Sequence, residues 1–551
     1  MSNELDPKDK LEILRGKYFL VPDGNNSIQE LVSVAVNAVI SSQGEGPTYP
    51  MVSTVPSISE LIEAAEVPVR MMADPEVILK RLPLLIQGTV KSGHPLMVKN
   101  IIPTASLPAL AAYTAVSPYM ANGVSGEDSG QMLLAELACA AAVAKLAGIN
   151  HRKSAGVFTF GGTGTNLYAL KIGLSKALPD HHMRGIYEDV VVIESVPSHY
   201  SHRTAVDWLG IGQNNLIRIS SHPDQTTKFD ELEEKAIQAV KSGKKIACIV
   251  ASGGTTSNMG IDDVEKVYRL RESLVTEYDL SYRPHIHVDS VLGWAFLNFL
   301  KYDFDSNPLD FKPETLEQIK KIVSRVATFR YADSFGVDFH KSGYVAYNSS
   351  MIVVKDRQDF NLLQREGAVM TPLFHDNEAY NPGKFTLETS RSAANMLATW
   401  VALQTFGQEG YQLLLGHAIE MGISFREAVE RHRDKGLFIA NQMQYGPDVF
   451  IRCYPVPSNP KKEYEEEMAD EELVKKNNRY VSDFFEWLNK TEYGFSVSKS
   501  SAAIYTHTGA PMMALRIYPL SPYITDNTAQ ELIERLAKAK VQFDLQNESR
   551  K

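Results

Sequence analysis

Short apolar runs rich in β-branched residues, separated by helical patterns, constrain the fold of this chain more than any other feature. Four such runs are spaced through the middle of the sequence. Runs of this length that alternate with helices predict a mostly parallel sheet with helices on both faces. The sequence is therefore expected to form an α/β fold. The runs are Val190–Ile193, Ile246–Val250, Ile286–Val288 and Met351–Val354.

A helical pattern between two of these runs indicates how the sheet is covered. Across Val264–Tyr278 apolar residues recur at a period near 3.6, and Glu265, Arg269 and Glu272 fall on the opposite side. This segment predicts the crossover helix of a βαβ unit. Met132–Gly148 predicts a long, apolar-rich helix ahead of the first strands.

The chain of 551 residues exceeds the usual size of one domain, and we expect three parts. Residues 1–125 mix short helical patterns with proline and glycine and predict an N-terminal helical segment. Residues 126–400 predict the large α/β domain, and residues 401–551 predict a smaller α+β domain. In that last part Met513–Tyr518 reads as a strand, and Thr528–Glu531 as a capping box that starts the final helix.

Charge and cysteine content argue against several classes of protein. The formal net charge is −10 and there is no basic patch, which argues against binding to nucleic acid or to an anionic membrane. Cys139, Cys248 and Cys453 are far apart, so a disulfide framework is not expected. No apolar stretch approaches the roughly 20 residues that span a bilayer, and no secretory signal is recognisable. We expect a cytoplasmic protein.

The first segment that could bind a ligand is the glycine-rich turn Phe160–Asn166, which leads into a predicted helix at Leu167–Ala177. Glycines allow backbone N–H groups to approach an anion, and a helix N-terminus adds the positive end of its dipole. Thr163 and Thr165, on either side of Gly164, add hydroxyl donors. The turn could hold a phosphate, but on its own it could equally be an ordinary tight loop.

The second segment is His287-Val-Asp289, at the end of an apolar strand. In an open parallel sheet ligands bind beyond the carboxyl ends of the strands, so Asp289 should face the crevice. A carboxylate beside a pyridine nitrogen would keep that nitrogen protonated. A protonated ring is the better electron sink for a carbanion.

A metal site competes for the same segment. His285, His287 and Asp289 alternate along one strand face and could ligate zinc, as in a metal-dependent hydrolase. Position 290 is serine, however, and no further cluster of ligands follows nearby. We therefore expect no metal, and the hydrolase remains an alternative outside the class favoured below.

The third segment, 332–341, ends in His340 and Lys341 and is followed by a glycine and a strand. Lys341 stands among apolar residues instead of other charges. Burial would lower the pKa of its ammonium group, which would favour the formation of Schiff bases. Ser334 and His340 could reach a phosphate.

The fourth segment, Pro197–His202, follows the strand Val190–Ile193. Its His199 could stack on a planar ring or act as an acid or base near neutral pH. A helix-capping loop with incidental histidines is the alternative.

Taken in this order, the four segments resemble the group II pyridoxal-phosphate-dependent amino-acid decarboxylases, which have the aspartate aminotransferase fold, fold type I. The resemblance extends from about His94 to Tyr411. Within it, Ile249–Thr256 matches the Ala-Gly-Thr-Thr segment of the family, and Glu388–Arg391 together with Trp400 matches a later signature. The resemblance implies pyridoxal 5′-phosphate as the cofactor and a homodimer with active sites at its interface.

The same resemblance implies roles for individual residues. Lys341 would form the Schiff base, His199 would stack on the ring and Asp289 would pair with the ring nitrogen. Arg516 would hold a substrate carboxylate, because its guanidinium geometry suits that group. Residues around His94 would line the substrate pocket. The remaining cofactor-binding residues are expected to be Thr163, Gly164, Thr165, Thr255, Val291, Ser334, His340 and Ser390.

Two departures from the family bear on the reaction. Ser290 and Val291 stand where the family usually has two alanines, and Val291 would press on the ring face opposite His199. The family also carries a tyrosine on a loop after the lysine, whereas the corresponding stretch here is Thr371–His375, and Tyr380 is the nearest tyrosine.

The predicted reaction is the decarboxylation of an L-amino acid to an amine and carbon dioxide. The alternative with the same cofactor is a carbon–carbon lyase of the phosphorylated sphingoid-base type, because His287–Gly293 resembles a segment of that lyase. The bond that stands perpendicular to the ring plane is the one that breaks, so the placement of the substrate carboxylate decides between the two.

Overall fold

The computed structural model describes residues 7–20, 28–50, 56–70, 74–365, 380–443, 445–491 and 493–548. The chain divides into two compact units. One comprises Met1–Met97 with Gly494–Ser496, and the other Val98–Tyr493 with Val497–Lys551. The first unit holds short helices, which agrees with the helical character predicted for the N-terminal segment. They are α1 (Pro7–Tyr18), α2 (Ile28–Ser41), α3 (Ile58–Glu63), α4 (Glu76–Leu79) and α5 (Leu82–Ile86).

The second unit is built on a seven-stranded sheet of order β1-β7-β6-β5-β4-β2-β3. The five strands β6, β5, β4, β2 and β3 are parallel to one another, while β7 is antiparallel to both β6 and β1. The sheet is mostly parallel, as predicted, and all four predicted runs are strands. The strands are β1 (Ala155–Thr159), β2 (Val190–Ser195), β3 (Leu216–Ile219), β4 (Lys245–Ser252), β5 (His285–Asp289), β6 (Ser334–Asp338) and β7 (Ser350–Val354).

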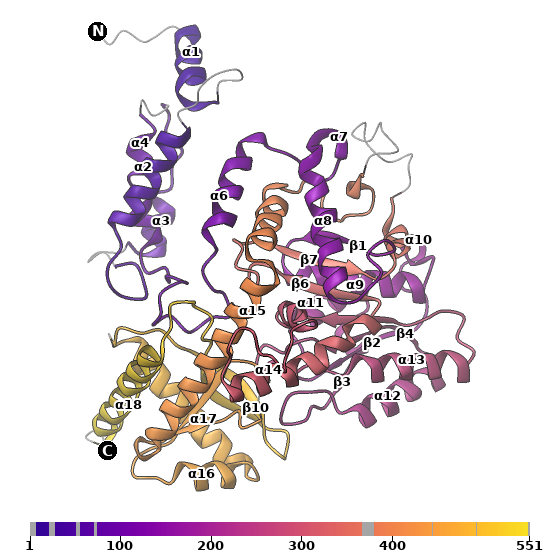
Figure 1. The fold of residues 1–551 in the computed structure, drawn as a ribbon, viewed down its shortest axis with the longest axis vertical. Helices are drawn as coiled ribbons and strands as arrows, with labels where there is room; N and C mark the ends of the chain where they lie inside the picture. Colours follow the sequence, from indigo (N-terminus) through magenta and orange to yellow (C-terminus); the bar gives the residue numbers. More distant parts are fainter. Residues whose placement is uncertain are drawn as a thin grey trace. The chain divides into compact units, whose positions relative to one another are not determined.

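Helices cover both faces of this sheet, as the predicted fold requires (Figure 1). In β2, Val191 and Ile193 pack into the core that includes α8, α12, α13 and α14, whereas Val190 and Val192 pack against α9 and α11 on the other side. Alternate residues of a strand point to opposite faces, so a continuously apolar run is what such a sheet needs. The helices are α8 (Gln131–Leu146), α9 (Gly162–Ala177), α10 (His181–Arg184), α11 (Ser201–Trp208), α12 (Phe229–Lys241), α13 (Val264–Glu277) and α14 (Pro313–Val326).

The predicted crossover helix is α13, which connects the neighbouring parallel strands β4 and β5. Two further helices, α6 (Leu107–Val116) and α7 (Gly126–Ser129), precede α8. The long helix α15 (Ala394–Arg431) follows the sheet and breaks its helical geometry at Gly407, whose φ is 57°.

A second, four-stranded antiparallel sheet of order β10-β11-β9-β8 forms the C-terminal α+β part. Its strand β11 is the predicted strand around Met513–Tyr518. The capping box was placed three residues too late. The final helix begins at Asp526, and the hydroxyl of Thr525 accepts a hydrogen bond from the backbone N–H of Thr528. The elements are β8 (Leu437–Ile439), β9 (Val449–Cys453), β10 (Ser498–Tyr505), β11 (Pro511–Ile517), α16 (Pro460–Glu467), α17 (Glu471–Asn489) and α18 (Asp526–Glu548).

Among the described residues, no helix combines the length and the apolar character that crossing a membrane requires.

Candidate active site

The carboxyl ends of four strands place the four predicted segments at one edge of the sheet. Strands β2, β5 and β6 run in one direction, and β1 runs with them because both β1 and β6 are antiparallel to β7. The glycine-rich turn follows β1 and His199 follows β2. Asp289 ends β5, and Lys341 follows β6.

The glycine-rich turn is the first turn of a helix, because α9 begins at Gly162 and not at Leu167 as predicted. Gly161 has a φ of 101°, a conformation that favours glycine. The side chain of Thr163 is exposed, whereas the hydroxyl of Thr165 is buried and donates to the carbonyl of Gly162 at 2.7 Å. The N–H groups of Gly164 and Thr165 donate to the carbonyl of Gly161 at 2.8 and 3.3 Å, so the N–H groups that precede them at this end of α9 are the ones that can receive an anion.

Asp289 is buried at the end of β5, and one of its two oxygens is engaged. Oδ2 accepts from Asn166 Nδ2 at 3.2 Å and lies 3.3 Å from His202 Nε2. Oδ1 is buried and has no hydrogen-bond partner. Burial by itself would raise the pKa of Asp289, but the adjacent charge of His202 outweighs it and holds the pKa well below its usual range.

His202 ends the fourth segment, and the sequence analysis gave it no role. It is fully buried on α11, and its Nδ1 lies 2.7 Å from Glu194 Oε2. Burial would lower the pKa of this imidazole, yet Asp289 and Glu194 outweigh burial and raise the pKa to about 9. A sequence signal exists for Glu194: it is a glutamate inside an otherwise apolar strand, and a buried carboxylate needs a partner.

Lys341 lies beside a carboxylate that the sequence analysis did not single out. Its Nζ is 2.9 Å from Asp338 Oδ2, and Ser350 donates to Asp338 Oδ1 at 2.6 Å. The expected lowering of the Lys341 pKa was wrong. Burial acts in that direction, but the charges of Asp338 and Asp289 outweigh it, and the pKa is raised.

His340 and His199 flank this region as neutral rings, because burial lowers the pKa of each. The Nδ1 of His340 lies 3.0 Å from the carbonyl oxygen of Ser349, and its ring packs on Tyr347 at 4.4 Å between centroids. The Nδ1 of His199 accepts from the backbone N–H of Ser201 at 3.2 Å. Its Nε2 is therefore the nitrogen that carries the proton.

The structure gives Ser334 different contacts from those predicted. Its buried hydroxyl lies 2.7 Å from His285 Nε2 and 2.8 Å from His287 Nδ1, so it is engaged deep under α9 and does not reach a phosphate. The other nitrogen of His287, Nε2, lies 3.1 Å from Asn166 Oδ1. Burial lowers the pKa of His287 to about 3. The two histidines thus orient Asn166 toward Asp289.

These contacts do not favour the metal-dependent hydrolase. His285 and His287 both turn to Ser334, and Asp289 turns to Asn166 and His202. Within the described ranges, no group of three or more histidine, cysteine, aspartate or glutamate side chains has the geometry of a metal site.

Other predicted residues lie around the same edge or in the C-terminal sheet. The hydroxyl of Thr255 donates to the carbonyl of Ser257 at 2.5 Å and accepts from the N–H of Gly260 at 2.8 Å. Val291 is buried, and its Cγ1 lies 3.1 Å from the position that a Cβ on Gly162 would take. Val291 therefore borders the start of α9.

Arg516 is half-buried on β11. Its Nε donates to Ser498 Oγ at 3.0 Å, and its guanidinium lies 4.9 Å from the centre of the Tyr518 ring. No carboxylate of the described residues forms an ion pair with it. His94 lies in the first compact unit, where its Nε2 is 2.9 Å from the carbonyl oxygen of Glu45.

The later family signature has a structural role. Ser390 is exposed, but Arg391 is buried and pairs with the buried Glu136 of α8. The hydroxyl of Tyr380 donates to the same Glu136 at 2.9 Å. The stretch Thr371–His375 lies outside the described residues.

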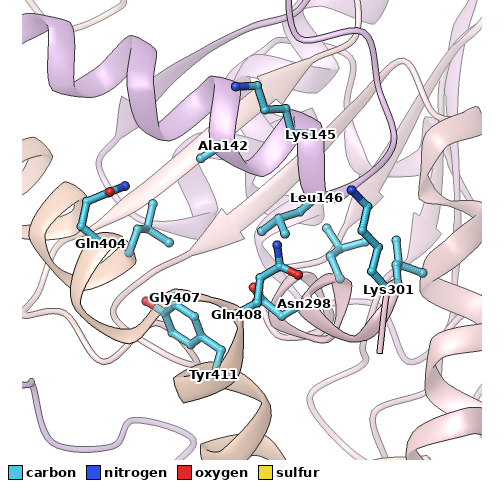
Figure 2. A pocket seen from close by; sticks show the side chains of 12 residues that line it. Ala142, Lys145, Leu146, Asn298, Lys301, Gln404, Gly407, Gln408 and Tyr411 are labelled. Atoms are coloured by element: carbon cyan, nitrogen blue, oxygen red, sulfur yellow. The ribbon is translucent and has the colours of Figure 1, made fainter. Parts of the chain in front are cut away.

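One hollow beside the sheet lies away from the predicted site residues. A cavity of about 420 Å³ opens between α8, the 3₁₀ helix η3 (Gly293–Phe299) and α15 (Figure 2). Lys145, Lys301 and Tyr411 are among its lining residues, and none of the predicted site residues is. The candidate site therefore rests on the chemistry at the strand ends and not on this cavity.

Comparison with known proteins identifies the family. The model of the pyridoxal-dependent decarboxylase conserved domain matches residues 60–450, which is more than half of the chain. The chain belongs to this family. The resemblance inferred from the four segments is confirmed, and the cofactor of the family is the predicted pyridoxal 5′-phosphate.

Curated members of the family are distant relatives. Aspartate 1-decarboxylase of Aliivibrio fischeri is 25% identical over 400 residues, which cover 69% of this chain and 65% of that protein. L-Tyrosine decarboxylase of Enterococcus faecium is 29% identical over 251 residues, which cover 42% and 40%. The chain thus spans less than two thirds of the length of either relative.

Solved structures establish the fold. Mouse CSAD superposes with a TM-score of 0.75 at 17% identity over 93% of this chain and 99% of that one. TDC of Oryza sativa, solved with PLP and tryptamine, gives a TM-score of 0.75 at 16% identity over 95% and 99%. The predicted fold type I is confirmed.

The residues present fit the cofactor. Asp289 Oδ1 is a buried acceptor without a partner, as a protonated ring nitrogen requires. Lys341 supplies an amine at the same edge of the sheet, and the start of α9 supplies N–H donors for a phosphate. When bound there, pyridoxal 5′-phosphate would supply an electron sink for a substrate carbanion.

Proposed function

We propose that this protein decarboxylates an L-amino acid to the corresponding amine and carbon dioxide. The observation that carries the proposal is the match of the decarboxylase family over residues 60–450, the range that contains Lys341, Asp289 and His199. The relatives described above are themselves decarboxylases, which favours this reaction over carbon–carbon cleavage.

Three residues have the central roles in the proposal. Lys341 would hold the cofactor through its side-chain amine. Asp289 keeps the ring nitrogen protonated through its free Oδ1. His199, whose Nδ1 is an acceptor from Ser201, offers the face of its ring and an Nε2 proton.

Further residues complete the cradle. Thr163, Gly164 and Thr165, in the first turn of α9, hold the phosphate with backbone N–H groups and the Thr163 hydroxyl. We further propose contacts from His340 and Val291, which lie at the same edge. Thr255 and Ser390 are proposed to contribute through the segments that match the family.

Arg516 is proposed to bind the substrate carboxylate, and His94 to line the substrate pocket. Arg516 has no carboxylate partner among the described residues, so its guanidinium is available for an anion. By holding the carboxylate, Arg516 would orient the bonds of the substrate α-carbon. The position of this anion therefore selects decarboxylation.

The proposal is tested with purified holoenzyme. Incubation with each common L-amino acid should release carbon dioxide from at least one of them, and Lys341→Ala should abolish both this release and the visible absorbance band. Lys355→Ala, at a lysine beyond β7, is the matched control and should leave both intact. Release of an aldehyde from a phosphorylated long-chain amino alcohol, with no carbon dioxide from any amino acid, would overturn the proposal in favour of the lyase.

We also propose a cytoplasmic homodimer whose active sites lie at the subunit interface. Family membership supports this assembly. Light scattering on the eluted protein should give twice the chain mass of 61.2 kDa. A mass equal to that of one chain at micromolar concentration would contradict it.

A further inference from the structure

Glu194 and His202 form a buried pair behind Asp289 that neither the sequence motifs nor the proposed reaction uses. Glu194 lies on β2 and His202 on α11, and both side chains are inaccessible to solvent. Two ionisable groups at such depth are costly unless each has a partner. We therefore infer that this buried pair between the sheet and α11 has a function.

The geometry favours a protonated His202 ring. Nδ1 of His202 lies 2.7 Å from Glu194 Oε2, and Nε2 lies 3.3 Å from Asp289 Oδ2, an ion-pair distance at which Nε2 forms no hydrogen bond in this structure. An ionised carboxylate near each ring nitrogen stabilises the imidazolium, the form that carries a proton on both nitrogens. The raised pKa of His202, about 9, agrees with this arrangement.

The charges alternate along a line that leads to the cofactor site. Arg218 on β3 lies 3.4 Å from Glu194 Oε1, and beyond Glu194 come His202 and Asp289. The order is therefore cation, anion, cation, anion. The next group in the series is the positive ring nitrogen that Asp289 is proposed to bind. His199 and His287, which also face this cluster, are neutral because burial lowers their pKa values. Lys341 faces Asp289 as a cation, and the charge of Asp289 helps to raise its pKa.

The two oxygens of Asp289 are not equivalent in this arrangement. Asn166 donates to Oδ2, and His202 faces the same oxygen. Oδ1 is left buried and without a partner. Holding one oxygen from behind fixes the carboxylate plane and turns the other oxygen outward.

We propose that Glu194 and His202 are positioning residues that keep Asp289 ionised and aim its Oδ1 at the ring nitrogen of the cofactor. This inference rests on the proposed role of Asp289 but not on the identity of the substrate. A pair of this kind acts before any chemistry, in the binding of the cofactor itself.

The first test reads the imidazole directly. In apo-protein labelled with ¹⁵N-histidine, the ring nitrogens of His202, assigned by their loss in His202→Gln, should both carry protons at pH 7.5. Glu194→Gln should convert the ring to a neutral form at a lower pH than in the wild type. A neutral His202 at pH 7.5 in the wild type would overturn the proposal.

The second test compares two cofactors on the apo-protein. His202→Gln should weaken the binding of pyridoxal 5′-phosphate at least about tenfold, the cost of weakening one charged hydrogen bond. The same variant should bind the deaza analogue, in which a carbon replaces the ring nitrogen, within about twofold of the wild type. A merely structural role for His202 would weaken both ligands equally, and that result would overturn the proposal.

Control variants keep the second test decisive. His181→Gln replaces a buried histidine near the far end of α9 and should leave both affinities unchanged. If His202→Gln fails to fold, Glu194→Gln gives the same comparison. Binding of pyridoxal 5′-phosphate without carbon dioxide release would contradict the proposed decarboxylation and leave this comparison fully readable.

Discussion

Lys341 and Asp338 form the contact that sets the state of the reactive amine before the cofactor arrives. The pair lies at 2.9 Å on a nearly buried segment after β6. Because Asp338 and Asp289 together outweigh burial, Lys341 carries its proton more firmly than a free lysine. If Lys341 forms the Schiff base as proposed, Asp338 would hold its amine in the protonated, unreactive form in the apo-protein.

Replacement of Asp338 by asparagine tests this view. Asp338→Asn should lower the pKa of Lys341 by about 1–3 units, since one opposite charge at short range has an effect of this size. The pH midpoint for the rate at which the apo-protein forms its visible band with pyridoxal 5′-phosphate should move down accordingly. Ser350→Ala removes a hydrogen bond to Asp338 and a long contact with His340 Nδ1 but leaves the charge of Asp338, so it should leave the midpoint in place. An unchanged midpoint in Asp338→Asn would show that Asp338 does not control the amine.

Site residues were predictable where a local pattern placed them at a strand end. The structure places Lys341, Asp289 and His199 at the carboxyl ends of strands, as this pattern indicated, and their roles stay predictions. Ser334 was assigned to the phosphate because it is close in sequence to Lys341, but it stands at the opposite end of β6 and contacts His285 and His287. His202 was passed over because its two partners come from different strands. Such partners are set by the packing of α11 on the sheet.

The first turn of helix α9 is the proposed phosphate-binding turn. The close packing of α9 on the sheet depends on one glycine. A Cβ on Gly173 would lie 2.4 Å from the carbonyl oxygen of Ala247 on β4. A methyl group at this position would push α9 away from the strand. The start of α9 would then move relative to Asp289.

Gly173→Ala should therefore destabilise the protein by about 1–3 kcal/mol, as overpacking in a core does. The free energy of unfolding in urea measures this loss. Gly46→Ala adds the same methyl group where nothing lies within 4 Å, and should change the stability by less than about 1 kcal/mol. Equal values for the two variants would mean that α9 can shift without cost.

The pair of Glu136 and Arg391 connects α8 to the chain before α15. Arg391 also donates to the carbonyls of Gly123 and Phe158, at 2.8 and 3.1 Å. Removing one partner of a buried pair leaves an uncompensated charge. This ion pair therefore anchors the segment Glu388–Arg391 to α8 through the buried side chain of Arg391.

Arg391→Met should lower the free energy of unfolding by about 3–5 kcal/mol. Arg269→Met breaks an exposed pair with Glu265 on α13 and should cost at most about 1 kcal/mol. Denaturant unfolding of the two variants side by side makes the comparison. A loss of less than about 1 kcal/mol in Arg391→Met would contradict the structural role.

Periodicity predicted the elements better than their ends or directions. Strands β2, β4, β5 and β7 and helix α13 were found from apolar patterns. The direction of β7 was not predicted, because β6 was not among the predicted strands. Only residues 339–349 separate β7 from β6, and a short connection without a crossover helix returns the chain antiparallel. The starts of α9 and α18 were placed late, since glycine and threonine patterns allow more than one cap.

The division of the chain is harder to read from sequence than its fold. The parts 1–125, 126–400 and 401–551 stay a prediction, and α15 runs across residue 400 without a linker. A helix that belongs to both the large domain and the C-terminal part joins them through shared packing. Composition shifts mark where patterns change, but they do not show which neighbouring elements a helix packs against.

The charge cluster at Asp289 also has a consequence for the pH dependence of folding in the apo-protein. His202 has a folded pKa of about 9 against a usual value of 6.5. A raised pKa stabilises the folded state fully below pH 6.5, and this contribution is lost as the pH rises through 9. A difference of this size corresponds to about 3 kcal/mol.

Urea unfolding of the apo-protein at pH 6, 7.5 and 9 should therefore show stability that falls with rising pH. The fall should be smaller in His202→Gln by about 3 kcal/mol over the range, because the variant has no group to deprotonate there. Glu194→Gln should show an intermediate fall, since one of the two carboxylates that hold the proton remains. His181→Gln serves as the control, with the wild-type slope expected. If the free energy of unfolding changes with pH in the same way in the wild type and in His202→Gln, His202 is a neutral ring in the folded protein. The alternation of charges from Arg218 to Asp289 would then lack the positive charge of His202.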